Sequence, residues 1–278
     1  MSNYVEGKVI VITGAGSGFG KLVAQKTAAL GAKVVGADIN EEQLREVVEG
    51  IRADGQAAEY KVADVTNKEQ MDAVAAFAVE KFGRVDVMLN NAGIMPLAYF
   101  ADHEAAWQGW HKSIDVNIKG VVNGITAVYD QMIEQGEGQI INISSIYGNY
   151  GIPGSGVYSA TKAAVKVISD SLRAEAKGKI KVTTVKPTGI PGTNLASAVV
   201  NNEAITGLAA NRQTEYAANA ATYYSDQMPA EQLDNDSVKY WAVTPEELAD
   251  NVVYVINQPW GVSVSDITVR ASGEDYVY

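Results

Sequence analysis

Short apolar runs alternate with longer amphipathic stretches along the chain. The apolar runs, which predict β-strands, lie near 8–13, 33–37, 57–62, 85–89, 138–144 and 181–186. The amphipathic stretches, which predict helices, lie near 18–30, 41–54, 67–82, 110–135, 158–177 and 245–256. Strands that alternate with helices form βαβ units, in which neighbouring strands are parallel. The pattern therefore predicts an α/β fold, a doubly wound parallel sheet (Rossmann fold) covered by helices on both faces.

The predicted strands are apolar without a clean period of two, as in the runs 9–12 and 140–143. Strands of this composition are buried on both faces of a sheet. Such sheets bind ligands at the carboxyl ends of their strands. Candidate site residues stand at the ends of all six predicted strands: polar residues or glycines at Thr13-Gly14, Asp38, Asp64, Asn90 to Gly93 and Ser144-Ser145, and Pro187 at the sixth. We therefore expect the functional site at this edge of the sheet.

The whole chain, 1–278, is predicted to form a single domain with this doubly wound sheet. Its length suits one large α/β domain, and no repeat, low-complexity stretch or charged linker divides it. The segment 195–243 differs from the rest, because it has a helical tendency near 203–225 and no predicted strand. Since it directly follows the sixth strand end, we expect it to form a lid over the substrate.

The composition argues against several classes of partner. The chain has 22 Lys and Arg against 33 Asp and Glu, a formal net charge of −11, which would repel nucleic acids and anionic membranes. It has no cysteine, so a disulfide framework and a thiolate nucleophile are both excluded. Its two histidines, His103 and His111, have no close third ligand, so no metal site is expected. Without a basic leader or a membrane-spanning run, we expect a soluble, cytoplasmic protein.

A glycine-rich turn, residues 14–20, separates the first predicted strand from the first predicted helix. Glycines adopt positive φ and have no Cβ, so a pyrophosphate can approach the backbone closely at Gly14, Gly18 and Gly20. The following helix offers its free N–H groups to the same anion. An ordinary tight turn is the alternative, but the position between strand and helix favours dinucleotide binding. Ser17 and Phe19 of this turn are expected to contact the cofactor.

Asp38 ends the second predicted strand, about twenty residues beyond the glycines. A carboxylate here can accept hydrogen bonds from an adenosine ribose and would repel a 2′-phosphate. We therefore expect the cofactor to be NAD rather than NADP, and we expect Ile39, the next residue, to contact it as well. The alternative is that Asp38 caps the helix beginning near Glu41. Asp64, followed by Val65, is expected to reach the adenine edge, and it could equally cap the next helix.

Tyr158 and Lys162 stand four residues apart in a predicted helix and so share one face. The spacing alone proves little, because Tyr4 and Lys8 have it too. What distinguishes the second pair is Ser145, thirteen residues upstream at a strand end. A free phenol titrates near about 10, and the positive charges of Lys162 and an oxidised nicotinamide are expected to lower that value. Tyr158 is then the general acid/base, and Ser145 holds the substrate oxygen.

With these residues in view, the chain resembles the short-chain dehydrogenases/reductases in their compact single-domain form. The matching motifs are Thr13-Gly-x-x-x-Gly18-x-Gly20, Asp38, Asp64-Val65, Asn90-Asn91-Ala92-Gly93, Asn117, Ser145 and Tyr158-x-x-x-Lys162. The resemblance implies a catalytic tetrad of Asn117, Ser145, Tyr158 and Lys162. It also implies that Asn91, Ala92 and Gly93 pack near the adenosine half. A homotetramer or homodimer built partly from the helices near 110–135 and 158–177 is implied as well.

Asn117 falls within a predicted helix, where its short polar side chain can bond the backbone and help to hold a water near Lys162. The chain departs from the family after the sixth strand, where Pro-Gly is usual and this sequence has Pro187-Thr-Gly189. Thr193 also comes one position late. We expect the cofactor to contact this loop at Pro187, Gly189, Ile190 and Thr193. The aromatic and acidic tail, 272–278, is expected either to end at a subunit interface or to fray.

The substrate side is expected to be aromatic and weakly charged, lined by Met95, Pro96, Tyr147, Tyr150 and the segment 195–243. No cationic clamp is evident, so a bulky apolar alcohol or ketone is favoured, with a hydroxysteroid as the specific prediction. Small diketones, cyclic terpenoid ketones and 3-oxoacyl substrates remain alternatives. A non-catalytic dinucleotide sensor would have no need of the Tyr, Lys and Ser. Epimerases and dehydratases related to this family usually have a GxxGxxG turn, unlike the GxxxGxG present here.

Overall fold

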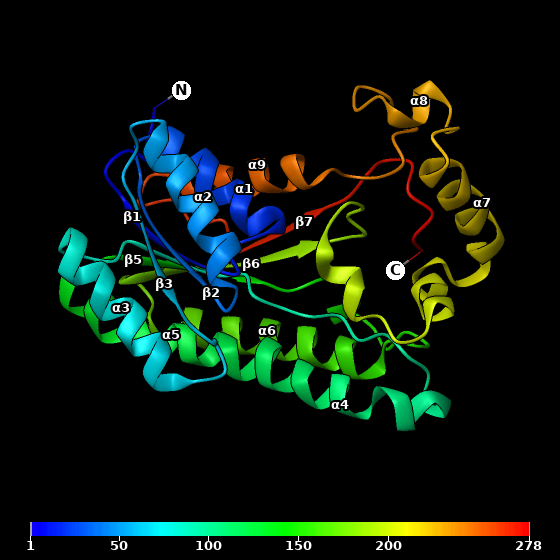
Figure 1. Cartoon of the computed structure of the whole chain (residues 1–278), viewed down its shortest axis with the longest axis horizontal. Helices are drawn as coiled ribbons and strands as arrows, with labels where there is room; N and C mark the ends of the chain where they lie inside the picture. The colour runs from blue at the N-terminus through cyan, green and yellow to red at the C-terminus, as the bar shows by residue number, and fades with distance from the viewer. Residues whose placement is uncertain (1, 278) are drawn as a thin grey trace.

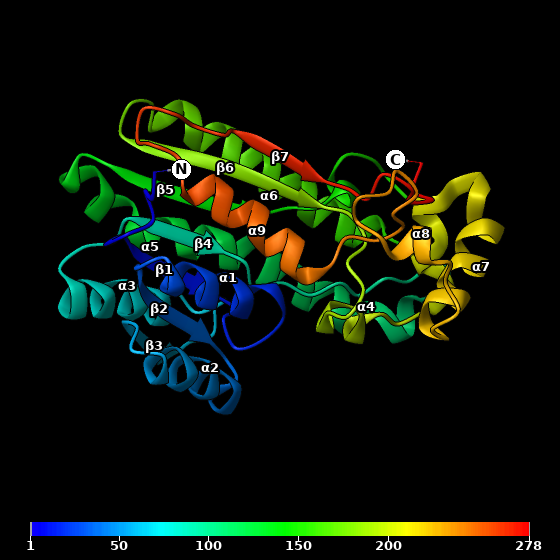
Figure 2. The same ribbon diagram turned by 90° about the horizontal axis from the view of Figure 1, so that it is seen from above.

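The computed structural model describes residues 2–277, which fold around a seven-stranded parallel sheet. The strands are β1 (Val9–Thr13), β2 (Lys33–Asp38), β3 (Ala58–Val62), β4 (Val87–Asn90), β5 (Gly138–Ile143), β6 (Ile180–Pro187) and β7 (Asp266–Val269). Their order is β3-β2-β1-β4-β5-β6-β7, and every neighbouring pair is parallel (Figure 2). The order reverses between β1 and β4, so the prediction of a doubly wound α/β sheet in a single domain is confirmed.

All six predicted strands are present, and a seventh strand, β7, was not predicted. This strand has four residues and pairs with β6 along the sheet edge. Three of its residues are at least partly exposed, and only Val269 is buried. An edge strand with polar, solvent-facing positions lacks the continuous apolar run by which the inner strands were recognised.

Helices cover both faces of the sheet (Figure 1). One face carries α1 (Gly18–Ala29), α2 (Glu41–Ala53) and α9 (Pro245–Ile256), and the other carries α3 (Lys68–Phe82), α5 (Gly120–Gln135) and α6 (Gly156–Glu175). The helix predicted near 110–135 is longer and composite. It begins as α4 (His103–Ile114), passes through one π-helical turn (Asp115–Lys119) and continues as α5.

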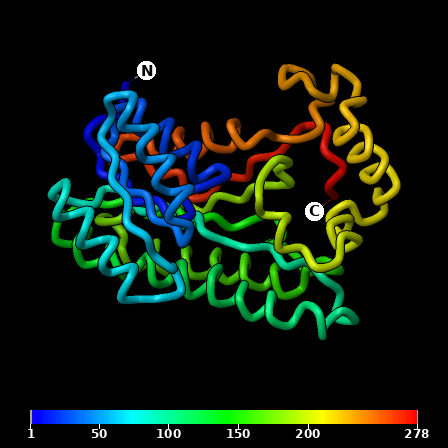
Figure 3. Tube along the Cα trace, viewed as in Figure 1, coloured from blue at the N-terminus to red at the C-terminus, as the bar shows by residue number. Residues whose placement is uncertain are grey.

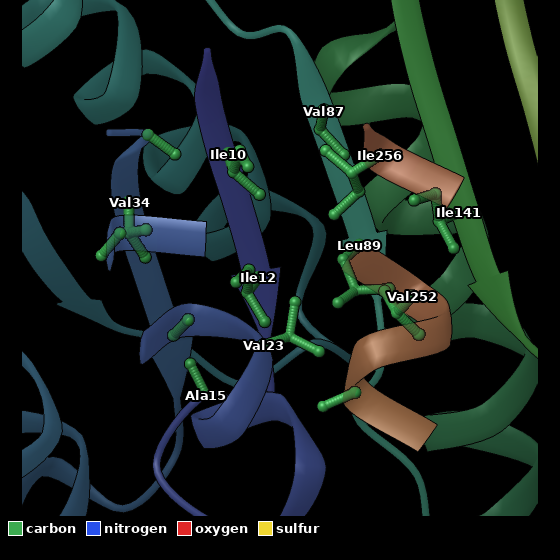
Figure 4. Packing of buried hydrophobic residues seen from close by; sticks show 14 of the residues in the cluster. Ile10, Ile12, Ala15, Val23, Val34, Val87, Leu89, Ile141, Val252 and Ile256 are labelled. Atoms are coloured by element: carbon green, nitrogen blue, oxygen red, sulfur yellow. The ribbon is translucent and has the colours of Figure 1, made fainter. Parts of the chain in front are cut away.

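The two faces of the sheet have separate hydrophobic cores. Along β1, Ile10 and Ile12 point toward α1 and α9, where they pack with Val23 and Val252 (Figure 4). The intervening valines of the same strand belong to the core on the other face. Alternate residues of each strand therefore bury in opposite layers, which is why the run is apolar at every position.

The segment after β6 lies beyond the carboxyl ends of the strands, beside the C-terminal tail (Figures 1 and 3). It contains the 3-10 helices η4 (Asn194–Ala198) and η5 (Asn202–Arg212), then α7 (Gln213–Tyr224) and α8 (Ala230–Leu233). As predicted, it contains no strand. Within residues 2–277, no helix is both long and apolar enough to cross a membrane.

The tail does not fray, so that alternative is wrong for its described residues, up to Val277. The Val277 N–H donates to the carbonyl of Leu208 at 3.1 Å, and the Trp241 Nε1 donates to Asp275 at 2.7 Å. Tyr276 packs against a buried cluster that includes Tyr158. The tail is therefore part of the wall of its own domain.

Candidate active site

A cavity of about 680 Å³ lies at the carboxyl ends of the strands. Every predicted catalytic or cofactor-binding residue lines it except Asn117. These lining residues are Gly14, Ser17, Gly18, Phe19, Gly20, Asp38, Ile39, Asp64, Val65, Asn91, Ala92, Gly93, Ser145, Tyr158, Lys162, Pro187, Gly189, Ile190 and Thr193. Residues of the predicted lid segment, such as Leu195 and Trp241, contribute to the wall. The cavity therefore brings the glycine-rich turn and the Tyr-Lys pair together.

The glycine-rich turn is held in a tight conformation. Gly14 has φ +67°, and a Cβ at Gly20 would lie only 2.3 Å from the carbonyl oxygen of Gly14. The side-chain amide of Asn91 donates to the carbonyls of Thr13 and Gly14, at 2.8 and 3.1 Å. Asn91 thus braces the turn itself, a role that its motif alone did not reveal.

The same turn presents an open surface to an anion. Gly18 has φ +53°, and a Cβ built there would meet no atom within 4 Å. Helix α1 begins at this residue, and its N-cap Ser17 makes no side-chain capping bond. The first N–H groups of α1 therefore remain available for a phosphate.

The loop after β6 lines the same cavity as the turn. Its Thr188 is buried and interacts with the carboxyl group of Glu274. The turn and this loop together fit an extended dinucleotide.

Asp38 holds the turn rather than capping a helix. Its Oδ2 accepts from the Gly16 N–H at 2.9 Å, and its Oδ1 accepts from the Asn40 N–H at 3.0 Å. The cap of α2 is Asn40, whose side chain accepts from the Gln43 N–H at 3.1 Å. The capping alternative for Asp38 is therefore wrong. Beside it lies Ile39, which is 70% exposed.

Asp64 likewise is not a helix cap. Its Oδ1 accepts from the N–H and the hydroxyl of Thr66, at 2.9 and 2.8 Å. The cap of α3 is Asn67, which accepts from the Gln70 N–H at 2.9 Å. Asp64 therefore shapes the turn after β3 and borders the cavity.

The adjacent serines have different surroundings. The Ser144 hydroxyl donates to the carbonyl of Lys162 at 2.8 Å, so it ties β5 to α6. The Ser145 oxygen accepts from the Tyr147 N–H at 3.2 Å and interacts with the Tyr158 phenol. Ser145 is therefore the serine that can share a substrate oxygen with Tyr158, as the spacing predicted.

Tyr158 and Lys162 are both buried, with 2% and 4% of their surface exposed. The Lys162 Nζ donates to the carbonyl of Ile143 at 3.0 Å and lies 5.7 Å from the centre of the Tyr158 ring. Burial lowers the pKa of Lys162 to about 8. Burial also raises the pKa of Tyr158 above its ordinary value, although Ser145 opposes this shift.

In the protein without a cofactor, Lys162 therefore does not bring the pKa of Tyr158 below its ordinary value. The expected lowering, which also involves an oxidised nicotinamide, stays a prediction for the cofactor-bound protein. The cost of desolvating a buried phenolate exceeds the stabilisation that its neighbours provide. Without further positive charge, the phenol stays protonated at neutral pH.

Asn117 lies outside the cavity wall but directly behind it. It sits in the π-helical turn and is 1% exposed. Its Oδ1 accepts from the Ile94 N–H at 3.0 Å, while its Nδ2 donates to the Ile94 carbonyl and to the Thr161 hydroxyl at 2.9 and 3.1 Å. The π-turn, a geometry often found at functional sites, therefore links the loop after β4 to α6.

The cavity wall on the substrate side differs in part from the prediction. Met95 and Tyr147 line the cavity as expected, whereas Pro96 and Tyr150 do not. Residues of the C-terminal tail line it instead, namely Glu274, Asp275 and Tyr276. The available signal was the aromatic and acidic character of the tail, which was assigned to an interface or to fraying.

The displaced glycine of the loop after β6 has a steric explanation. A Cβ at Gly189 would lie 1.9 Å from the Tyr276 hydroxyl oxygen. The tail therefore packs directly on this loop, and the absence of a side chain at 189 makes room for it. In the same loop, the Thr193 hydroxyl donates to the carbonyl of Ile190 at 3.3 Å.

Comparisons with known proteins agree with this geometry. The short chain dehydrogenase family profile matches residues 8–204. An uncharacterized oxidoreductase of Listeria monocytogenes is 34% identical over 278 residues, covering 98% of this chain and 99% of the relative.

Solved structures give the same picture. A short-chain dehydrogenase/reductase of Burkholderia phymatum in complex with NAD is 29% identical, with a TM-score of 0.74 over 96% of this chain and 90% of the other. A gluconate 5-dehydrogenase of Burkholderia cenocepacia in complex with NADP and tartrate is 27% identical, with a TM-score of 0.76 over 96% and 95%. The chain belongs to the short-chain dehydrogenase/reductase family of oxidoreductases.

Proposed function

We propose that the protein is an NAD(H)-dependent oxidoreductase that interconverts a secondary alcohol and a ketone. The observation that carries the proposal is the meeting of Tyr158, Lys162 and Ser145 in the cavity that also contains the open glycine-rich turn. A dinucleotide sensor would have no use for a buried phenol beside a buried lysine. A bound nicotinamide would exchange hydride with the substrate carbon.

The chain's own residues carry the proton. During reduction, Ser145 hydrogen-bonds the ketone oxygen, and the Tyr158 phenol gives its proton to that oxygen as the carbon accepts hydride. The phenol is protonated at neutral pH, which is the form that this step needs. Lys162, with a pKa of about 8, is mostly charged at pH 7 and stabilises the phenolate that remains. In oxidation the phenolate takes the proton back.

Asn117 acts through other groups, as a positioning residue. By fixing Ile94 and Thr161, it sets the spacing between the loop after β4 and helix α6, which carries the Tyr-Lys pair. A water held between Asn117 and Lys162 would connect the ammonium group to the proton path.

NAD is proposed over NADP because Asp38 ends β2 at the cavity wall, where its carboxylate would repel a 2′-phosphate. The basic residues among those lining the cavity are Lys112 and Lys162, and neither lies next to Asp38 in the sequence. The solved relatives include complexes with NAD and with NADP, so the preference rests on this carboxylate.

The proposed substrate is a bulky, mostly apolar compound of the hydroxysteroid class. Its body would lie against a wall that includes Tyr147, Ile205, Leu208 and Tyr216. Reduction of small diketones, terpenoid ketones or 3-oxoacyl compounds is the alternative within the same reaction type.

The test is NADH oxidation with steroid ketones, small diketones and cyclic monoterpenones, for the wild type and for Tyr158→Phe. The variant keeps the ring and loses the transferable proton, so turnover should fall by roughly 10²-fold or more. NADH binding, followed by its fluorescence, should stay unchanged. Wild-type turnover in Tyr158→Phe would contradict the mechanism.

A further inference from the structure

The tail places a buried carboxylate without a cationic partner in the cavity wall. Asp275 is 8% exposed and lines the cavity. Its neighbour Glu274 pairs with Arg270 at 2.6 Å, but no Lys or Arg within residues 2–277 forms an ion pair with Asp275. A carboxylate in this position is costly unless something donates hydrogen bonds to it.

One oxygen of the Asp275 carboxylate accepts two hydrogen bonds, and the other accepts none from the described residues. The Oδ2 accepts from Trp241 Nε1 at 2.7 Å and from Asn219 Nδ2 at 2.9 Å. The Oδ1 accepts no hydrogen bond from the described residues. It is also not fully enclosed by protein atoms, so a ligand or water can reach it. Because Asp275 lines the cavity and its Oδ2 is held by two donors, we infer that Oδ1 is the oxygen available to a ligand. The two hydrogen bonds to Oδ2 fix the orientation of the Asp275 carboxylate.

An aromatic wall connects this carboxylate with the catalytic phenol. The rings of Tyr158 and Tyr147 lie 5.4 Å apart, and Tyr276 packs against the cluster that contains both. The ring of Tyr216 lies 5.5 Å from that of Tyr276 and 5.9 Å from that of Trp241, the residue that holds the carboxylate. An apolar substrate body can lie along these rings with one end at each polar site.

The tail is also joined to the loop at the reacting end of the cavity. The Tyr276 hydroxyl occupies the space that a side chain at position 189 would need. The Asp275 carboxylate therefore belongs to a tail that is packed in place at the site, beside α7 (Figure 3).

We propose that Asp275 is the substrate-recognition residue, whose Oδ1 accepts a hydrogen bond from a hydroxyl or ammonium group of the substrate, distant from the carbon that exchanges hydride. This inference rests on the proposed function and specifies its substrate: an apolar body with a polar donor at its far end. A substrate without the donor would leave the buried oxygen unpaired, and sites built for such a bond discriminate strongly.

The test uses three ketones that differ only at the far end, namely 4-phenylbutan-2-one carrying a para methyl, hydroxyl or aminomethyl group. Wild-type kcat/KM with NADH should be roughly tenfold to hundredfold higher for at least one donor-bearing ketone than for the methyl ketone. Comparing the hydroxyl with the aminomethyl compound shows whether Asp275 prefers a neutral or a cationic donor on the substrate. Equal kcat/KM for all three in the wild type would overturn the proposal.

The matched variants are Asp275→Asn and Asp236→Asn, the second being an exposed carboxylate in the segment 195–243. Asp275→Asn should lower kcat/KM for the donor-bearing ketone far more than for the methyl ketone, whereas Asp236→Asn should keep the wild-type preference. A uniform loss on all three ketones in Asp275→Asn would mean a structural role and would overturn the proposal.

Failure of the proposed function can be told apart from failure of this inference. Ketone binding to the enzyme–NADH complex, measured by quenching of NADH fluorescence, reports the preference without turnover. Preferential binding of a donor-bearing ketone that Asp275→Asn abolishes would support the inference even if no ketone were reduced. That same absence of reduction would count against the proposed reaction.

Discussion

At the scale of single residues, the site contains a positive charge that opposes folding. The pKa of Lys162 falls from 10.5 to about 8 because the ammonium group is buried. Below about pH 8 the group is protonated in both the folded and the unfolded chain, and the folded state bears the full cost. Between pH 8 and 10.5 only the unfolded chain holds the proton, so this contribution makes the protein more stable as pH rises.

Lys162→Met should therefore stabilise the cofactor-free protein at pH 7. The shift corresponds to roughly 3 kcal/mol, from which the lost hydrogen bond to Ile143 subtracts about 1 kcal/mol. Urea unfolding should show the difference between variant and wild type shrinking from pH 7 to pH 10. A difference independent of pH would refute this origin, and exposed Lys177→Met is the control.

Asp38 permits a separate residue-scale prediction about cofactor choice. Asp38→Asn keeps an oxygen for the N–H of Gly16 or Asn40 and removes the charge. The kcat/KM preference for NADH over NADPH should drop roughly tenfold, which is the size of one screened charge repulsion. Asp54→Asn, at the exposed C-cap of α2, should change nothing. An unchanged preference in Asp38→Asn would assign cofactor choice to other residues.

At the scale of elements, the inner strands and the helices that cover them could be predicted because burial dictates their sequence. The run from Val9 to Ile12 is apolar because alternate side chains enter two different cores. The edge strand β7 and the π-turn at Asn117 were not predictable in this way. The first lacks a two-sided apolar run, and the second differs from an α-helix only in hydrogen bonds that residue periodicity does not encode.

The candidate site shows the same division. Residues at strand ends could be located because the topology brings all carboxyl ends to one edge. Asp275 and Tyr276 reach that edge through contacts made by the tail, and no local pattern specifies where a tail packs. The displaced Gly189 is a consequence of this packing. Its position could not be interpreted from the sequence, because the residue that packs on it, Tyr276, lies 87 positions further along.

The packing of the tail on the loop can be tested with Gly189→Ala. Its Cβ would lie 1.9 Å from the Tyr276 hydroxyl, so the tail must move. We expect a loss of roughly 1–3 kcal/mol in stability and a higher KM for the ketone. The loss should be smaller in a Tyr276→Ala background, as a double-mutant cycle would measure. Gly151→Ala, where a Cβ meets nothing within 4 Å, is the control. Equal losses in both backgrounds would show that the two sites are independent.

At the scale of the whole molecule, each of the helices α4, α5 and α6 exposes a large apolar side chain in the single chain. Trp107 is 60% exposed, Val122 is 39% exposed and Val167 is 65% exposed. These side chains lie on helices that cover one face of the sheet (Figure 1). Large apolar side chains gathered on outer helix surfaces are typical of subunit contacts. We propose that they contribute to a homodimer or homotetramer.

Because an interface between identical subunits uses the same surface on each chain, one charged substitution acts in every copy. Val167→Asp should therefore shift the molar mass measured by light scattering toward the 29.6 kDa of a single chain. Val238→Asp, at an 80% exposed position in the segment 195–243, should leave the mass unchanged. A wild-type mass of 29.6 kDa would contradict the oligomer, and an unaltered oligomer in Val167→Asp would exclude this residue from its interface. Since the helix that carries Val167 also carries Tyr158 and Lys162, dissociation is expected to reduce turnover together with mass.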